Sequence, residues 1–80
     1  MDITLDEVIE MLEDIQGDID YENCTTLIDD RMLDSFDILA IVSGADEEFD
    51  VSIPAKDIIP ENFNSAQALC ALFNRLASED

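Results

Sequence analysis

Apolar residues recur at helical spacing in three separate stretches of this chain, which makes an all-helical fold the simplest way to bury them. The first stretch contains Leu5, Val8, Ile9, Leu12 and Ile15. The second contains Phe36, Leu39, Val42 and Ala45, flanked by Ile38, Ile41 and Phe49. The third contains Ala66, Leu69, Cys70, Phe73 and Leu76. No stretch alternates apolar and polar residues as a half-buried strand does, so the pattern predicts helices without a sheet.

The first two helices have recognisable ends. Thr4 and Glu7 form a capping-box pattern in front of the first helix, which is expected to end near Gly17. The second helix is expected from about Ser35 to Glu48. Its apolar stripe is wider than a surface helix needs, so this helix is expected at the centre of the fold.

A long loop, Asp18–Asp34, separates these helices and is expected to be ordered. Its apolar residues, which are expected to attach it to the core, are Leu27, Ile28, Met32 and Leu33. Gly44, inside the second helix, requires either close packing at that position or early fraying of the helix.

Two prolines delimit the segment before the last helix. Pro54 precedes AKDII and Pro60 follows it, so a short third helix is expected between them. Asn64, with Gln67 three residues later, is expected to open the last helix. The sequence therefore predicts one domain over residues 1–80, an all-α four-helix bundle with three longer helices, a short third helix and a long loop after helix one.

Acidic residues outnumber basic ones by 21 to 3, which gives a net charge of -18. Nucleic acid is excluded as a partner, because its phosphates carry the same sign of charge. Partner proteins are expected to present basic patches, and repulsion between copies favours a monomer. The same repulsion opposes the compact state, so salt or magnesium is expected to raise the melting temperature.

The cysteines and the amino-terminal residues indicate a cytoplasmic protein. Cys24 and Cys70 lack metal-ligand spacing and histidine is absent, so no specific metal site is predicted. Free thiols fit a reducing compartment, and Cys70 is expected in the core. The segment MDITLDEVIE is acidic and amphipathic, unlike a secretory signal. The sequence contains no run of about eighteen apolar residues, so no membrane span is predicted.

The segment LDSFD, which ends at Asp37, lies where the long loop turns into the second helix. It places the Ser35 hydroxyl at a helix N-terminus, where unpaired N–H groups and the helix dipole favour negative charge. A phosphate esterified to Ser35 would be stabilised there. The same residues also fit a simple N-cap by Asp34 or Ser35, which stabilises a helix by about 1 kcal/mol.

The wider segment DSFDILAIVSGADEEFDVSIP resembles the acyl carrier protein family. Asp34, Ser35 and Phe36 match the Asp-Ser-Leu-like motif that opens the second helix of the family. The matching closing element consists of Glu47, Glu48 and Phe49, followed by Ile53 and Pro54. The other predicted helices and the long loop also lie where the family places them, so the resemblance covers nearly the whole chain.

The resemblance implies that Ser35 receives 4′-phosphopantetheine from coenzyme A through a separate magnesium-dependent phosphopantetheinyl transferase. Asp34 and Phe36 would flank this attachment site. The thiol of the arm would hold acyl cargo as a thioester and present it to the acyl-transferring enzymes of fatty-acid or polyketide synthesis. The carrier itself is not expected to be an enzyme, since no serine here has a plausible base to activate it.

Partners of this family usually dock on helix two through basic residues. The acids that would face them here are Asp37, Asp46, Glu47 and Glu48, together with Asp34. The acidic stripe is thinner than in the fatty-acid type, because Ala40, Ser43 and Gly44 stand where that type tends to carry an acid, a larger apolar residue and an alanine. The cognate enzymes are expected to differ accordingly.

The residues around Ser35 also look like those of D-alanyl and other stand-alone aminoacyl carriers, which an adenylating ligase loads. The similarity rests on Leu33 before Asp34 and on Phe36 after Ser35. The cargo therefore stays open between fatty or polyketide acyl groups and aminoacyl groups.

Acidity alone suggests two rival functions. Asp18, Asp20 and Glu22 alternate as calcium ligands do in an EF-hand, and Asp29 stands in twelfth place. Asn23 occupies the sixth place, where the loop needs glycine, and aspartate in twelfth place substitutes poorly for a bidentate glutamate. The second rival is an acidic adaptor or nucleic-acid mimic, which would occupy a basic surface without being modified.

Overall fold

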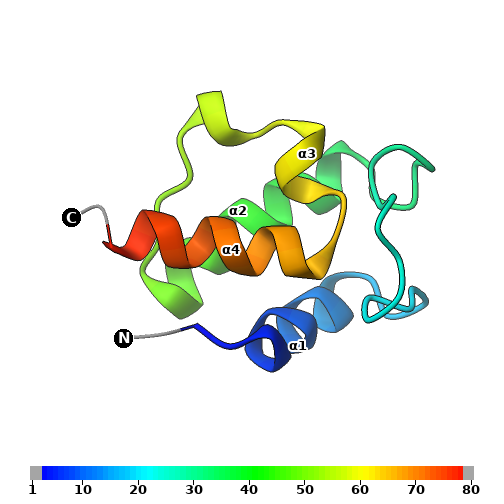
Figure 1. Cartoon of the computed structure of the whole chain (residues 1–80), viewed down its shortest axis with the longest axis horizontal. Helices are drawn as coiled ribbons and strands as arrows, with labels where there is room; N and C mark the ends of the chain where they lie inside the picture. Colours follow the sequence, from blue (N-terminus) through cyan, green and yellow to red (C-terminus); the bar gives the residue numbers. More distant parts are fainter. Residues whose placement is uncertain (1–2, 79–80) are drawn as a thin grey trace.

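The computed structural model describes residues 3–78, which fold as four α-helices and one 3-10 turn. These elements are α1 (Leu5–Ile15), α2 (Ser35–Phe49), η1 (Ala55–Asp57), α3 (Pro60–Phe63) and α4 (Ala66–Ser78) (Figure 1). No strand occurs in this part of the chain, so the all-helical prediction is confirmed. Within the same residues, no helix is long and apolar enough to cross a membrane.

Helix α1 begins with the predicted capping box. The Thr4 hydroxyl oxygen accepts a hydrogen bond from the Glu7 N–H at 3.2 Å, and the Glu7 carboxylate accepts one from the Thr4 N–H at 3.1 Å. The helix buries Val8, Met11 and Leu12 on one face, as its apolar spacing predicts.

The helices surround one core. Helix α1 packs against α2 and α4, and α3 packs against α4 (Figure 1). The Phe49 ring of α2 and the Phe73 ring of α4 lie 5.8 Å apart, centroid to centroid. The radius of gyration is 11.3 Å, close to the value of about 12 Å expected for a compact chain of this length.

Close packing explains Gly44, and the helix does not fray early. A Cβ atom at this position would lie 2.7 Å from the Sδ atom of Met11 in α1. Any larger residue would therefore require the Met11 side chain to move, and glycine lets that side chain pack directly against α2. Helix α2 continues beyond Gly44 to Phe49.

The long loop is attached to the core, partly through a residue that the apolar pattern does not single out. Leu27 and Leu33 are buried as predicted, Ile28 is half-buried, and the prediction for Met32 is wrong because its side chain is 39% exposed. Tyr21 is 2% exposed, and its hydroxyl lies within hydrogen-bond distance of the carbonyl oxygens of Leu12 and Gln16. These contacts tie the loop to the end of α1.

Two predicted helix starts are wrong. The segment between Pro54 and Pro60 forms only the turn η1, and the short helix α3 begins at Pro60 itself, because proline suits a first helical position. Ser65 caps α4, since its hydroxyl accepts a hydrogen bond from the Ala68 N–H at 3.0 Å. The Asn64 side chain instead accepts hydrogen bonds from two backbone N–H groups of the long loop, at 3.0 and 3.1 Å.

Candidate functional site

Ser35 occupies the first position of α2, and its side chain is exposed. The cap is supplied by Asp34, whose carboxylate accepts a hydrogen bond from the Asp37 N–H at 3.0 Å. In return, the Asp37 carboxylate accepts one from the Asp34 N–H at 3.2 Å. Of the two capping alternatives, the structure therefore selects Asp34, which leaves the Ser35 hydroxyl without a hydrogen bond to any residue in the range 3–78.

The backbone around Ser35 has donors to offer an anion. The N–H groups of the first helical residues, Ser35 and Phe36, have no carbonyl partner inside the helix. These N–H groups form the positive end of the helix dipole, which favours a negatively charged phosphate on the Ser35 hydroxyl. The carboxylates of Asp34 and Asp37 oppose it, so a phosphoryl group at Ser35 is expected to point away from them and towards solvent.

Two apolar residues near the start of α2 face solvent, whereas Ile38 between them is half-buried. The Phe36 side chain is 80% exposed and that of Leu39 is 62% exposed, whereas Ile41 and Ala45 of the same helix are completely buried. Periodicity predicts the helix but not this exposure. The width of the apolar stripe predicts a central helix, and this prediction is wrong for the start of α2, where part of the stripe is left uncovered.

The acids predicted to dock partners form two groups on α2. Asp34 and Asp37 lie at its start, where both are engaged in the cap. The exposed residues Asp46, Glu47 and Glu48 lie in its last turn. About 14 Å of helix separates the two groups, given the rise of about 1.5 Å per residue. Of the exposed apolar pair, Phe36 lies between the two acids of the first group, and Leu39 lies at the start of this interval.

A small apolar pocket lies beside the start of α2. It has a volume of about 100 Å³ and is lined by residues of the long loop, α2, α3 and the segment before α3. The lining residues are Ile28, Ile38, Ile58, Ile59, Pro60 and Phe63. This volume is smaller than that of a cavity of about 150 Å³ that holds benzene, so the pocket as it stands takes only a short apolar group.

The predicted calcium ligands do not form a cluster. The Asp20 carboxylate accepts a hydrogen bond from the Asn23 amide at 2.8 Å, and the Asp29 carboxylate accepts one from the Asn64 amide at 3.3 Å. No group of three or more potential ligands capable of holding a metal ion occurs among residues 3–78. The loop hypothesis therefore has no geometric support.

The two cysteines are free thiols and are both half-buried. The Cys24 Sγ atom lies 3.4 Å from the Met32 Sδ atom, and the Cys70 Sγ atom lies 3.4 Å from the Ile3 carbonyl oxygen. Burial raises the pKa of the Cys70 thiol. The place of Cys70 on the apolar face of the last helix predicts a core position, but Cys70 is half-buried and packs against the edge of the core.

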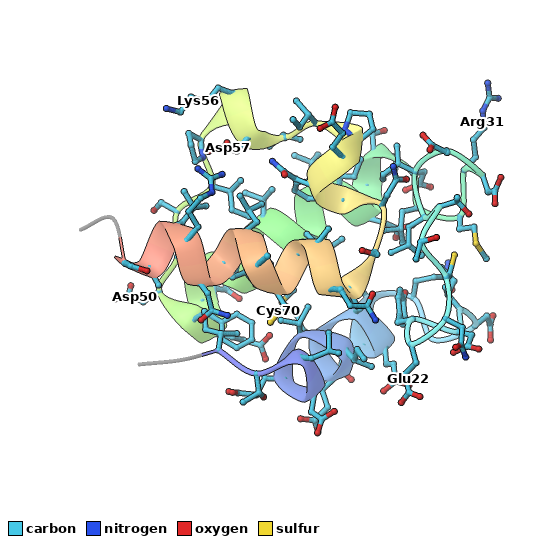
Figure 2. The ribbon with its side chains drawn as sticks, viewed as in Figure 1. Glu22, Arg31, Asp50, Lys56, Asp57 and Cys70 are labelled. Atoms are coloured by element: carbon cyan, nitrogen blue, oxygen red, sulfur yellow. The ribbon has the colours of Figure 1, made fainter. Side chains whose placement is uncertain are left out.

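Of the three basic residues, Arg31 lies apart from Lys56 and from Asp57, the ion-pair partner of Arg75. Arg31 extends from the long loop and Lys56 from η1, at opposite ends of the molecule in Figure 2. Arg75 of α4 forms an ion pair of 3.0 Å with Asp57. Of these cations, Arg31 stands closest to Ser35 along the chain, four residues before it.

Comparison with known proteins identifies no relative. No protein-family model matches the chain, and neither does any curated protein or solved structure. The function must therefore be argued from the residues and their geometry.

Proposed function

We propose that this chain is a carrier protein that holds 4′-phosphopantetheine on Ser35 and presents thioester-bound cargo to partner enzymes. The observation that carries the proposal is the position of Ser35 at the start of α2. Ser35 is exposed, and its hydroxyl is not used for capping because Asp34 caps the helix. A serine in this position combines an accessible hydroxyl with backbone donors for the phosphate that links it to the arm. The motif similarity around Ser35 supports the same reading, as does the order of the four helices.

The carrier would supply no catalysis of its own. Coenzyme A would provide the arm, and a separate transferase would join the phosphate of the arm to the Ser35 oxygen, with release of the nucleotide part of coenzyme A. The cargo would then be attached by an acyl- or aminoacyl-loading ligase or an acyltransferase. The chain has no histidine, the side chain that most often serves as a general base, which suits such a passive role.

Partners would dock along the exposed side of α2. Phe36 and Leu39 offer an apolar contact next to Ser35. Asp46, Glu47 and Glu48 offer acidic contacts at the other end of the helix, where a basic partner surface would be attracted. Partners are thus proposed to combine an apolar contact near the transferred group with basic residues farther away.

One observation favours the aminoacyl alternative for the cargo. The apolar pocket beside the start of α2 has a volume of about 100 Å³, which is small for a long acyl chain. A short polar cargo would need no shelter. The two kinds of carrier are separated by a comparison of two loading reactions. An aminoacyl carrier should be loaded with D-alanine by an adenylating ligase, and a fatty-acid carrier by a long-chain acyl ligase.

The proposal is tested by the mass of the intact protein. Incubation with coenzyme A, magnesium and a broad-specificity phosphopantetheinyl transferase should add one phosphopantetheine, and Ser35→Ala should abolish the addition. Ser43→Ala is the matched control, because Ser43 is an exposed serine of the same helix and this variant should still be modified. An acidic adaptor would gain no mass in any of the three forms.

A further inference from the structure

Arg31 has a backbone conformation that arginine rarely adopts. Its φ angle is 57°, in the left-handed region. The Arg31 N–H donates to the Ile28 carbonyl at 3.0 Å and the Met32 N–H to the Leu27 carbonyl at 2.9 Å. This is the hydrogen-bond pattern with which a helical turn ends, and its left-handed position is usually filled by glycine, because a Cβ atom is unfavourable there.

In the part of the chain that the structure describes, the Arg31 side chain makes no direct contact that offsets this strain, and its attraction to the nearby acids acts through solvent. It is exposed and projects away from the helices into solvent (Figure 2). The neighbouring acids are engaged elsewhere: Asp29 accepts a hydrogen bond from Asn64, Asp30 accepts one from Thr26, and Asp34 caps α2. Within residues 3–78, Arg31 makes no side-chain hydrogen bond or ion pair.

The charge of Arg31 is opposite to that of the surface around it. Asp29, Asp30 and Asp34 are all exposed and lie within three residues of it. A partner that is basic throughout its contact surface would be attracted by these acids and repelled by Arg31. A partner with one carboxylate opposite Arg31 would meet no such repulsion, and would gain a charge pair whose planar geometry suits arginine.

We propose that Arg31 is a specificity-determining residue, which pairs with a carboxylate on the phosphopantetheinyl transferase that loads Ser35. The inference rests on the proposed function, because it assigns a partner contact to the same site. Selection would work through repulsion as well as attraction, since transferases with an unbroken basic surface would be disfavoured.

The test measures loading by the phosphopantetheinyl transferase of the source organism, with coenzyme A, as kcat and KM. Arg31→Gly and Arg31→Asn both remove the charge and suit the left-handed conformation. Each should raise KM about tenfold, as expected for the loss of one charge pair, with little change in kcat. Arg31→Lys should retain part of the effect. Lys56→Gln removes the same unit of charge from η1, far from Arg31, and should load like the wild-type chain.

Melting temperatures separate a contact with the partner from a defect of folding. Arg31→Gly and Arg31→Asn should melt a few degrees higher than the wild-type chain, because the backbone strain is relieved, while they load less well. Wild-type KM in both variants would overturn the proposal, and so would a lower melting temperature in both. If the wild-type chain is not loaded at all, the proposed function fails and this inference falls with it; if it loads and the variants load equally well, only the inference fails.

Discussion

Helices α1 and α2 begin in the same way but present different residues to solvent. Each starts with a capping box, formed at Thr4 in α1 and at Asp34 in α2. Each cap is preceded by a buried apolar residue, Ile3 at 8% exposure and Leu33 at 4%. By the local rules of helix initiation the two starts are equivalent.

The first two residues of the helices differ, because α1 begins with an apolar and then a polar residue and α2 with a polar and then an apolar residue. Helix α1 has half-buried Leu5 followed by exposed Asp6, whereas α2 has exposed Ser35 followed by Phe36, which is 80% exposed. Helix formation needs neither an exposed serine nor an exposed phenylalanine here, since α1 forms without them. An exposed serine followed by an exposed phenylalanine is the arrangement that the proposed attachment and docking site at the start of α2 requires.

The largest difference between the two helices should appear when one leucine of each is shortened. Leu12→Ala in α1 removes a completely buried side chain and should lower the free energy of unfolding by about 2–5 kcal/mol. Leu39→Ala in α2 removes a side chain that is 62% exposed and should cost less than about 0.5 kcal/mol. Urea denaturation measures both, and equal losses would show that α2 packs in a different way from that described.

The carboxyl end of α1 is held by Tyr21, so alkaline pH should release it. Burial, reinforced by the charges of Asp37 and Glu13, raises the pKa of Tyr21 from 10.0 to about 12. The stabilisation that goes with this shift is complete below pH 10 and should be lost as the pH rises from 10 to 12, a loss of about 2 kcal/mol. Tyr21→Phe is the control, and its stability should lack this part of the pH dependence.

The contact between α1 and α2 can be tested at Gly44. Gly44→Ala gains about 1 kcal/mol of helix propensity, but the new methyl group meets Met11 and should cost about 1–3 kcal/mol. The net result should be a loss of about 1 kcal/mol. In a Met11→Ala background the same change should stabilise the protein. A stabilised Gly44→Ala single variant would contradict the close approach of the two helices.

Removal of either capping box should have the same effect on stability but a different effect on the modification of Ser35. Thr4→Ala and Asp34→Ala should each lower the free energy of unfolding by about 1 kcal/mol. Only Asp34→Ala, next to the attachment site, should also slow the modification of Ser35. Equal loading of both variants would show that Asp34 acts only as a helix cap and has no role in the modification of Ser35.

Local patterns in the sequence are enough to predict the parts of the fold that depend on near neighbours. Helix α1, its capping box and the start of α2 at Ser35 are in the predicted places, because the cap residue and the helical period are encoded within a few positions. Recognising Asp34 as the cap explains why the Ser35 hydroxyl is not needed for capping, but not why Ser35 is exposed, since Leu5 at the matching position of α1 is half-buried.

The parts that could not be predicted depend on contacts between distant segments. Asn64 and Ser65 are both good capping residues, and the choice falls on Ser65 because Asn64 binds the long loop, more than thirty positions away. Period alone likewise does not reveal that Phe36 faces solvent while Ile41 is buried, since the neighbours of α2 decide which face is covered. The left-handed backbone of Arg31 has no signature in its residue type.

Protein purified from its own cells shows whether Ser35 carries the arm. Mass spectrometry of the intact chain, followed by fragmentation of the peptide that contains Ser35, should find one phosphopantetheine or a thioester of it on that residue. A native protein found only with an unmodified Ser35, under conditions in which known carriers of the same cells are loaded, would contradict the account.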